Sequence, residues 1–171
     1  MTGKQYNITQ GEYAIADEPG AMISTILGSC VATCLWDPDR HIGGMNHILV
    51  AQTSVGGVAC DFAGVNAMEL LINAMVRRGA DRTNLRAKVF GGAKMVRGLS
   101  DIGHLNGLFA LGFLEREGIP CLGQSLGGTS ARHIRFFPAE GRAMQKSVES
   151  APELKPIFKP ASPQKNDVEL F

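Results

Sequence analysis

Residues 12–50 consist of apolar runs, rich in β-branched and aromatic residues, that short turns separate. Runs of this length predict β-strands, which we place at 13–16, 22–27, 31–36 and 45–50. Gly28 and Ser29 form the turn between the second and third runs, and Asp37-Pro-Asp-Arg marks the next turn. We therefore expect a sheet whose strands follow one another closely, with Cys30 at the point where strand geometry is interrupted.

Two segments with helical spacing of apolar residues follow these strands. The first is predicted from about Ala63 to Arg78, with Asp61 as N-cap and Gly79 as stop, and the second from about Asp101 to Glu117. The expected apolar face of the second helix comprises Ile102, Leu105, Leu108, Phe109, Gly112 and Phe113. Further short strands are expected at 85–90, 119–122, 132–137 and 142–148. The pattern predicts the α/β class: a single layered domain with a mixed β-sheet covered by two amphipathic helices.

The composition limits how many domains the chain can form and which class of partner it can bind. The 171 residues are 44% hydrophobic, which suits one core, and we assign residues 1–148 to one domain and residues 149–171, with four prolines, to a mobile C-terminal tail. The formal net charge of +1 provides no overall excess of positive charge with which to bind nucleic acid. We expect no signal peptide, no membrane insertion and a cytoplasmic location, in which cysteines stay reduced.

Cys30 and His47 are the candidate catalytic residues. A thiol at a glycine-led turn can have backbone N–H groups directed at its sulfur, which favours the thiolate. His47 lies seventeen residues downstream, after Gly43-Gly44-Met-Asn46 and at the start of another apolar run, where it can act as general base. His133 is a weaker second candidate for the base.

The same residue types also fit structural and metal-binding roles. A cysteine in an apolar run is more often structural than catalytic, and Cys34, Cys60 and Cys121 receive that interpretation. A zinc site is disfavoured, because Cys30 and Cys34 would lie about 13 Å apart along a strand. The glycine-rich segments 90–94 and 126–129 match neither common phosphate-loop pattern, so they are interpreted as tight turns.

Taken together, the motifs closely resemble the CheD family of chemoreceptor glutamine deamidases. The resemblance spans about residues 21–146. It is carried by the segments Leu27-Gly-Ser-Cys-Val-Ala32, Gly43-Gly-Met-Asn-His47, Met68-Glu-Leu-Leu-Ile-Asn73, 85–93, Leu126-Gly-Gly128 and Arg135-Phe136. The resemblance implies a fold similar to that of cytotoxic-necrotizing-factor deamidase toxins, and hydrolysis of receptor glutamine to glutamate without a cofactor.

The resemblance also implies roles for individual residues. Cys30 attacks the carboxamide carbon, and His47 transfers protons. The family has a threonine six residues before the nucleophile; Ser24 occupies that position here, and Thr25 is the neighbouring alternative. We expect backbone N–H groups near Cys30, at Ser29, together with Asn46, to stabilise the oxyanion.

The expected partners are methyl-accepting chemotaxis receptors as substrate. Some family members also act on receptor methyl esters, and some bind the phosphatase CheC. The competing hypothesis is a non-catalytic adaptor of the same fold that docks on receptors or on chemotaxis signalling proteins.

Overall fold

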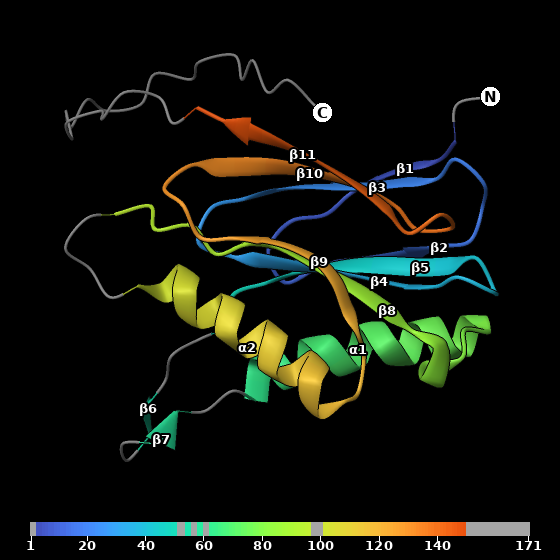
Figure 1. Ribbon diagram of the computed structural model, residues 1–171, viewed down its shortest axis with the longest axis horizontal. Coiled ribbons are helices and arrows are strands. Elements are labelled where there is room, and N and C mark those ends of the chain that lie inside the picture. The colour runs from blue at the N-terminus through green and yellow to red at the C-terminus, as the bar shows by residue number, and fades with distance from the viewer. Residues whose placement is uncertain (1–2, 51–53, 56–57, 60–61, 97–100, 150–171) are drawn as a thin grey trace, which may run out of the picture.

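The computed structural model describes residues 3–50, 54–55, 58–59, 62–96 and 101–149. These residues form two stacked β-sheets, with two helices covering the outer face of one of them (Figure 1). The first sheet has the order β1-β3-β10-β11, and comprises β1 (Gln5–Asn7), β3 (Met22–Leu27), β10 (Ala131–Phe137) and β11 (Arg142–Val148). In this sheet β1 is parallel to β3, and the other pairs are antiparallel.

The second sheet lies between the first sheet and the helices (Figure 1). Its order is β2-β5-β4-β8-β9, from β2 (Tyr13–Ala16), β5 (Ile42–Ile48), β4 (Val31–Asp37), β8 (Arg86–Gly91) and β9 (Cys121–Leu126). Only the pair β8 and β9 is parallel among its described pairs. Two short strands, β6 (Ser54–Val55) and β7 (Val58–Ala59), pair with each other.

Helices α1 (Phe62–Arg78) and α2 (Ile102–Arg116) pack against the second sheet. Their boundaries agree with the predicted helices, and Asp101 caps α2 by accepting a hydrogen bond from the His104 N–H. The predicted cap of α1, Asp61, lies outside the described residues, as does the tail from residue 150 onward. A short 3-10 turn, η1 (Arg82–Asn84), leads from α1 toward β8.

Two hydrophobic cores form, one on each face of the second sheet. One core lies between the helices and the second sheet and includes Met68, Leu71 and Phe113. The other lies between the sheets and includes Ile23, Leu27 and Phe136 of the first sheet. It also includes Ala32, Cys34, Trp36, Met45 and Phe90 of the second sheet. The α/β class with two helices and mixed sheets is therefore confirmed, but the strands divide between two sheets where the sequence predicted one.

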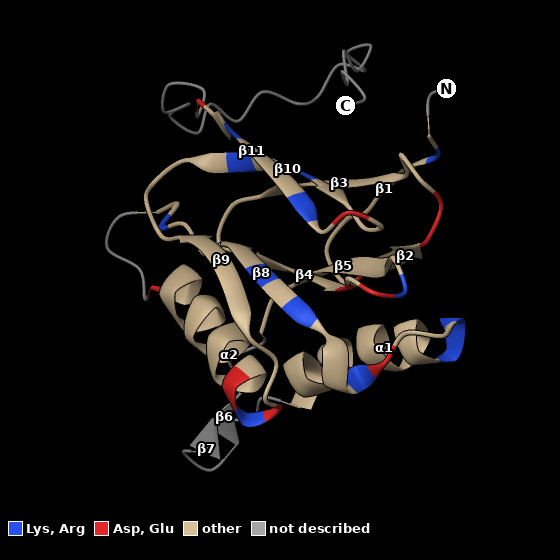
Figure 2. Cartoon of the chain, turned by 45° about the vertical axis from the view of Figure 1, so that its right-hand side comes forward, with Lys and Arg blue, Asp and Glu red and all other residues tan. Residues whose placement is uncertain are grey.

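The predicted apolar face of α2 is partly wrong. Ile102, Leu105 and Leu108 are exposed, whereas Asn106 and Ala110 are buried against the sheet. Residues 102–114 contain no Asp, Glu, Lys or Arg, and Figure 2 shows the body of α2 without these residues. Because this helix is apolar on most sides, the spacing of its apolar residues does not indicate which side packs against the sheet.

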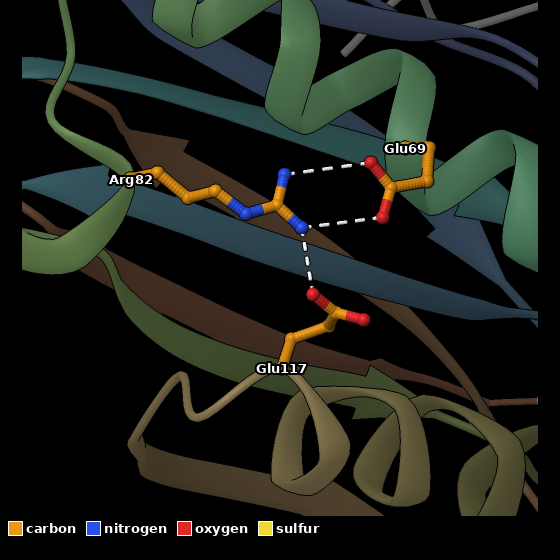
Figure 3. Close-up of polar contacts among 3 residues, drawn as sticks. All are labelled: Glu69, Arg82 and Glu117. Carbon is orange, nitrogen blue, oxygen red and sulfur yellow. Dashed lines mark hydrogen bonds and ion pairs between the residues drawn. The ribbon is translucent and has the colours of Figure 1, made fainter.

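One ion-pair cluster connects the middle of α1 with the C-terminal end of α2. Arg82, in η1, donates to both carboxylate oxygens of Glu69 on α1 and to Glu117 at the end of α2 (Figure 3). All three side chains are about one third exposed, so solvent screens the attraction. The cluster therefore contributes little to the stability of the fold.

Candidate active site

Cys30 lies in the turn between β3 and β4, and neighbouring segments hold that turn by its carbonyl groups. The N–H groups of Ala93 and Gly92 donate to the carbonyls of Gly28 and Cys30, at 3.0 and 2.9 Å. The side-chain Nδ2 of Asn106 donates to the carbonyl of Ser29, at 2.8 Å. Three successive carbonyls are thus bound by the segment after β8 and by α2.

Gly91 allows this close approach. Its φ of +111° is one that L side chains rarely adopt, and a Cβ built on it would lie 2.2 Å from the carbonyl oxygen of Cys30. Any side chain at this position would displace the turn that carries the thiol.

His47 and Cys30 lie on the same face of the second sheet. His47 on β5 is directly opposite Ala32 on β4, and Ala32 belongs to the core between the sheets. Cys30, two residues before Ala32, packs against the same core. The thiol and the imidazole therefore both border the space between the sheets.

Thr25 fixes the orientation of the imidazole. Its Oγ1 donates to the carbonyl of Ile8, at 2.7 Å, and also lies 2.7 Å from Nδ1 of His47. A hydroxyl has one hydrogen, which the carbonyl takes, so Nδ1 of His47 must donate to Thr25. In the neutral imidazole the lone pair is then on Nε2, which is the atom available to act as a base.

The structure does not bring Ser24 to the histidine. Strand alternation directs Ser24 and Thr25 to opposite faces of β3, and the Ser24 hydroxyl donates to Oδ1 of Asn7 on β1. Both hydroxyls are buried, but only that of Thr25 contacts His47. The position that the family pattern favoured therefore differs from the one in contact here.

Asn46 faces away from the thiol, contrary to the expected oxyanion contact. Its Oδ1 accepts from the Thr33 N–H, at 3.0 Å, and its Nδ2 donates to the sulfur of Met68 on α1. Asn46 and His47 are adjacent on β5, so their side chains lie on opposite faces of the sheet.

The second candidate base, His133, is adjacent to Ile134 on β10. Because Ile134 faces the core between the sheets, the His133 side chain lies on the opposite, outer face of the first sheet.

The loop before β2 borders the site. The Gly11 N–H donates to the His47 carbonyl, and the His47 N–H donates to the Glu12 carbonyl. Gln10, in the same loop, brings its Oε1 to 3.8 Å from the Cys30 sulfur. A carboxamide thus lies beside the thiol in the free protein.

Burial favours the neutral form of both the Cys30 thiol and the His47 imidazole. It raises the pKa of the half-buried Cys30 thiol, which differs from the expected thiolate. It lowers the pKa of His47, against a smaller opposing effect of the Glu12 carboxylate. The thiol and the imidazole are therefore both uncharged near neutral pH, and such a thiol needs a base to become a nucleophile.

Sequence reasoning missed Asn106 and Gln10. Both amides are distant in sequence from the cysteine, and neither forms part of a recognisable motif. In the part of the chain that the structure describes, no three His, Cys, Asp or Glu side chains gather as a metal site, and no helix has the length and hydrophobicity to cross a membrane.

Comparisons with known proteins show which family this chain belongs to. The family model for CheD, described as chemotactic sensory transduction, matches residues 51–147. A probable chemoreceptor glutamine deamidase CheD of Acidiphilium cryptum is 46% identical, covering 98% of this chain and 94% of that protein. The chain belongs to the CheD family. Its relative from Agrobacterium fabrum, which carries the same description, is 45% identical over 98% of this chain and 97% of its own length.

Solved structures are more distant from this CheD chain. The hypothetical protein YfiH of Bacillus licheniformis is 14% identical, with a TM-score of 0.46, over 66% of this chain and 49% of that one. A Neisseria meningitidis protein, NMB0706, is 12% identical with a TM-score of 0.40, over 69% of this chain and 52% of that one.

Proposed function

We propose that this CheD chain hydrolyses glutamine side chains of chemotaxis receptors to glutamate and ammonia, using Cys30 and His47. The observation that carries the proposal is the Thr25 contact, which leaves Nε2 of His47 as a base on the same sheet face as the thiol. The near full-length relatives described as chemoreceptor glutamine deamidases support the choice of substrate.

The proposed acylation uses the neutral pair directly. Nε2 of His47 takes the thiol proton as the Cys30 sulfur attacks the carboxamide carbon, and the carbonyl oxygen becomes an oxyanion. The backbone N–H groups of the cysteine turn are suited to stabilise that oxyanion. The C–N bond then breaks, His47 returns the proton to the departing amine, and ammonia leaves a thioester on Cys30.

Deacylation repeats the proton transfers with water. His47 takes a proton from water, the resulting hydroxide attacks the thioester carbon, and the C–S bond breaks. The thiolate recovers its proton, so one water is consumed and one ammonia released for each glutamate formed. Thr25 holds the imidazolium that forms in both steps, since its hydroxyl accepts from Nδ1–H.

Mass spectrometry of a purified receptor fragment tests this proposal. We expect the wild-type protein to produce amide-to-acid conversion at glutamine side chains, and Cys30→Ala to produce none. Cys121→Ala is the matched control, because this cysteine is exposed on β9, in a strand that does not carry the proposed pair. Equal conversion by Cys30→Ala and wild type would refute the mechanism, and no conversion by any of the three would favour the adaptor.

A further inference from the structure

Asn106 connects the two halves of the site from a buried position on α2. Its side chain is 1% exposed. Nδ2 donates to the Ser29 carbonyl, at 2.8 Å, and Oδ1 accepts from the Val50 N–H, at 2.9 Å. One amide therefore joins the turn before Cys30 to the segment that leaves the His47 strand, and the Val50 bond prevents the amide from being reversed.

Close backbone contact brings α2 near enough for this short side chain. Gly103, one turn before Asn106, packs on Gly92, and a Cβ on Gly103 would lie 2.5 Å from the Gly92 carbonyl oxygen. Gly92 in turn donates to Cys30. The helix, the end of β8 and the cysteine turn thus pack as one unit.

The Ser29 carbonyl and the Cys30 N–H belong to the same peptide group. In a trans peptide these two groups point in opposite directions, so fixing one fixes the other. Asn106 holds the Ser29 carbonyl toward α2, and the Cys30 N–H is consequently directed away from α2. Within the described ranges neither the Cys30 nor the Ser29 N–H donates to a protein acceptor.

We propose that Asn106 is a positioning residue that aims the Cys30 N–H at the oxyanion formed on the substrate carbonyl. The inference rests on the proposed function, and it explains how the Cys30 N–H is held in position for the oxyanion before the reaction begins. A donor held in place before reaction stabilises developing charge without reorganisation, and loss of one such donor typically costs about 10²- to 10³-fold in rate. Asn106 makes no contact with substrate in this account; it acts through the peptide.

The test compares turnover with thiol reactivity in Asn106→Leu, which keeps the side-chain size and removes both hydrogen bonds. We expect kcat for glutamine conversion to fall by about 10²-fold with a smaller change in KM. Alkylation of Cys30 by iodoacetamide forms no oxyanion, so its rate should stay within a few-fold of wild type. Asn84→Leu is the control, because Asn84 uses its amide on Asp37, at the far end of β4 from Cys30.

Asn106→Asp provides a variant with a distinct signature. A protonated carboxyl can donate to the Ser29 carbonyl as the amide does, whereas a carboxylate cannot. The defect in kcat relative to wild type should therefore shrink as the pH falls, while the defect of Asn106→Leu should not.

Two results would overturn the inference. Wild-type kcat in Asn106→Leu would show that the peptide needs no such support. An equal fall in kcat and in the alkylation rate would show that Asn106 supports the thiol and imidazole generally. Failure of the proposed function is a separate outcome, since it would appear as turnover by Cys30→Ala.

Discussion

Oγ1 of Thr25 lies 2.7 Å from Nδ1 of His47 and donates its own hydrogen to the Ile8 carbonyl. The contact joins the two sheets, because Thr25 is on β3 and His47 is on β5. It also assigns the imidazole tautomer, which is the chemical condition for a base at Nε2.

Thr25→Val should therefore impair the reaction more than Ser24→Ala does. Valine keeps the β-branched shape but leaves Nδ1 without its acceptor, so we expect kcat/KM to fall by about 10- to 100-fold, or about 1.4–2.7 kcal/mol. Thr25→Ser should recover most of the rate, because it restores the hydroxyl. Steady-state kinetics on a receptor fragment would measure the series. A larger loss in Ser24→Ala would return the third role to the position that the family pattern indicates.

In a plot of kcat/KM against pH, the fall on the acid side should occur at a pH below the ordinary imidazole pKa of about 6.5. Burial lowers the pKa of His47, so the neutral base persists to lower pH than a free imidazole would. Glu12 opposes this effect, and Glu12→Gln should move the acid limb lower still. The measurement is kcat/KM against pH, which reports the free enzyme. An acid limb that moves upward in Glu12→Gln would contradict this electrostatic account.

A carboxylate at position 10 should slow thiol chemistry. Gln10 places its Oε1 3.8 Å from the Cys30 sulfur, so Gln10→Glu would bring a negative charge there and raise the thiol pKa further. We expect alkylation of Cys30 at neutral pH to slow by up to about tenfold, the equivalent of one pKa unit. Gln10→Ala is the control, since it removes the carboxamide without adding charge. Equal rates in the two variants would show that residue 10 does not approach the sulfur in solution.

Gly91→Ala should damage the site as well as the stability. The Cβ would meet the Cys30 carbonyl in addition to the backbone strain of a positive φ. Gly118→Ala separates the two effects, because Gly118 has a φ of +68° and open space around it. We expect Gly118→Ala to cost about 1–2 kcal/mol of unfolding free energy with normal kcat, and Gly91→Ala to cost more and to lose activity. Thermal denaturation together with kinetics would distinguish them, and full activity in Gly91→Ala would contradict the proposed seating of the thiol.

Local patterns in the sequence predicted most elements of the fold. The strands around Cys30 and both helices follow from periodicity and turn residues, which act over a few positions. The division of the strands into two sheets did not follow, because an apolar strand pattern does not specify which sheet the strand joins. Strand β1 was not predicted, since Gln5–Asn7 has little apolar character.

The residues of the candidate site also fall into two groups: those that local sequence indicates and those that only the fold reveals. Cys30 and His47 stand out because each follows glycine, within two to four positions, in a recognisable motif. Thr25 and Ser24 could not be separated, because the choice depends on which face of β3 meets the second sheet. Asn106 is 76 positions after Cys30, in the part of α2 that has no Asp, Glu, Lys or Arg, and only its packed position reveals the bond to Ser29. Asn46 was misplaced because its neighbour His47 occupies the other face of the same strand.

The most direct test of the central claim is detection of the thioester on Cys30. Wild-type protein is mixed with an equal amount of receptor fragment, quenched in acid during turnover, and mapped by peptide mass spectrometry. We expect a receptor-derived acyl adduct on the Cys30 peptide that disappears as glutamate accumulates, and none on Cys34 or Cys121. Glutamate formation at the wild-type rate by Cys30→Ala, with no adduct on any cysteine, would contradict it.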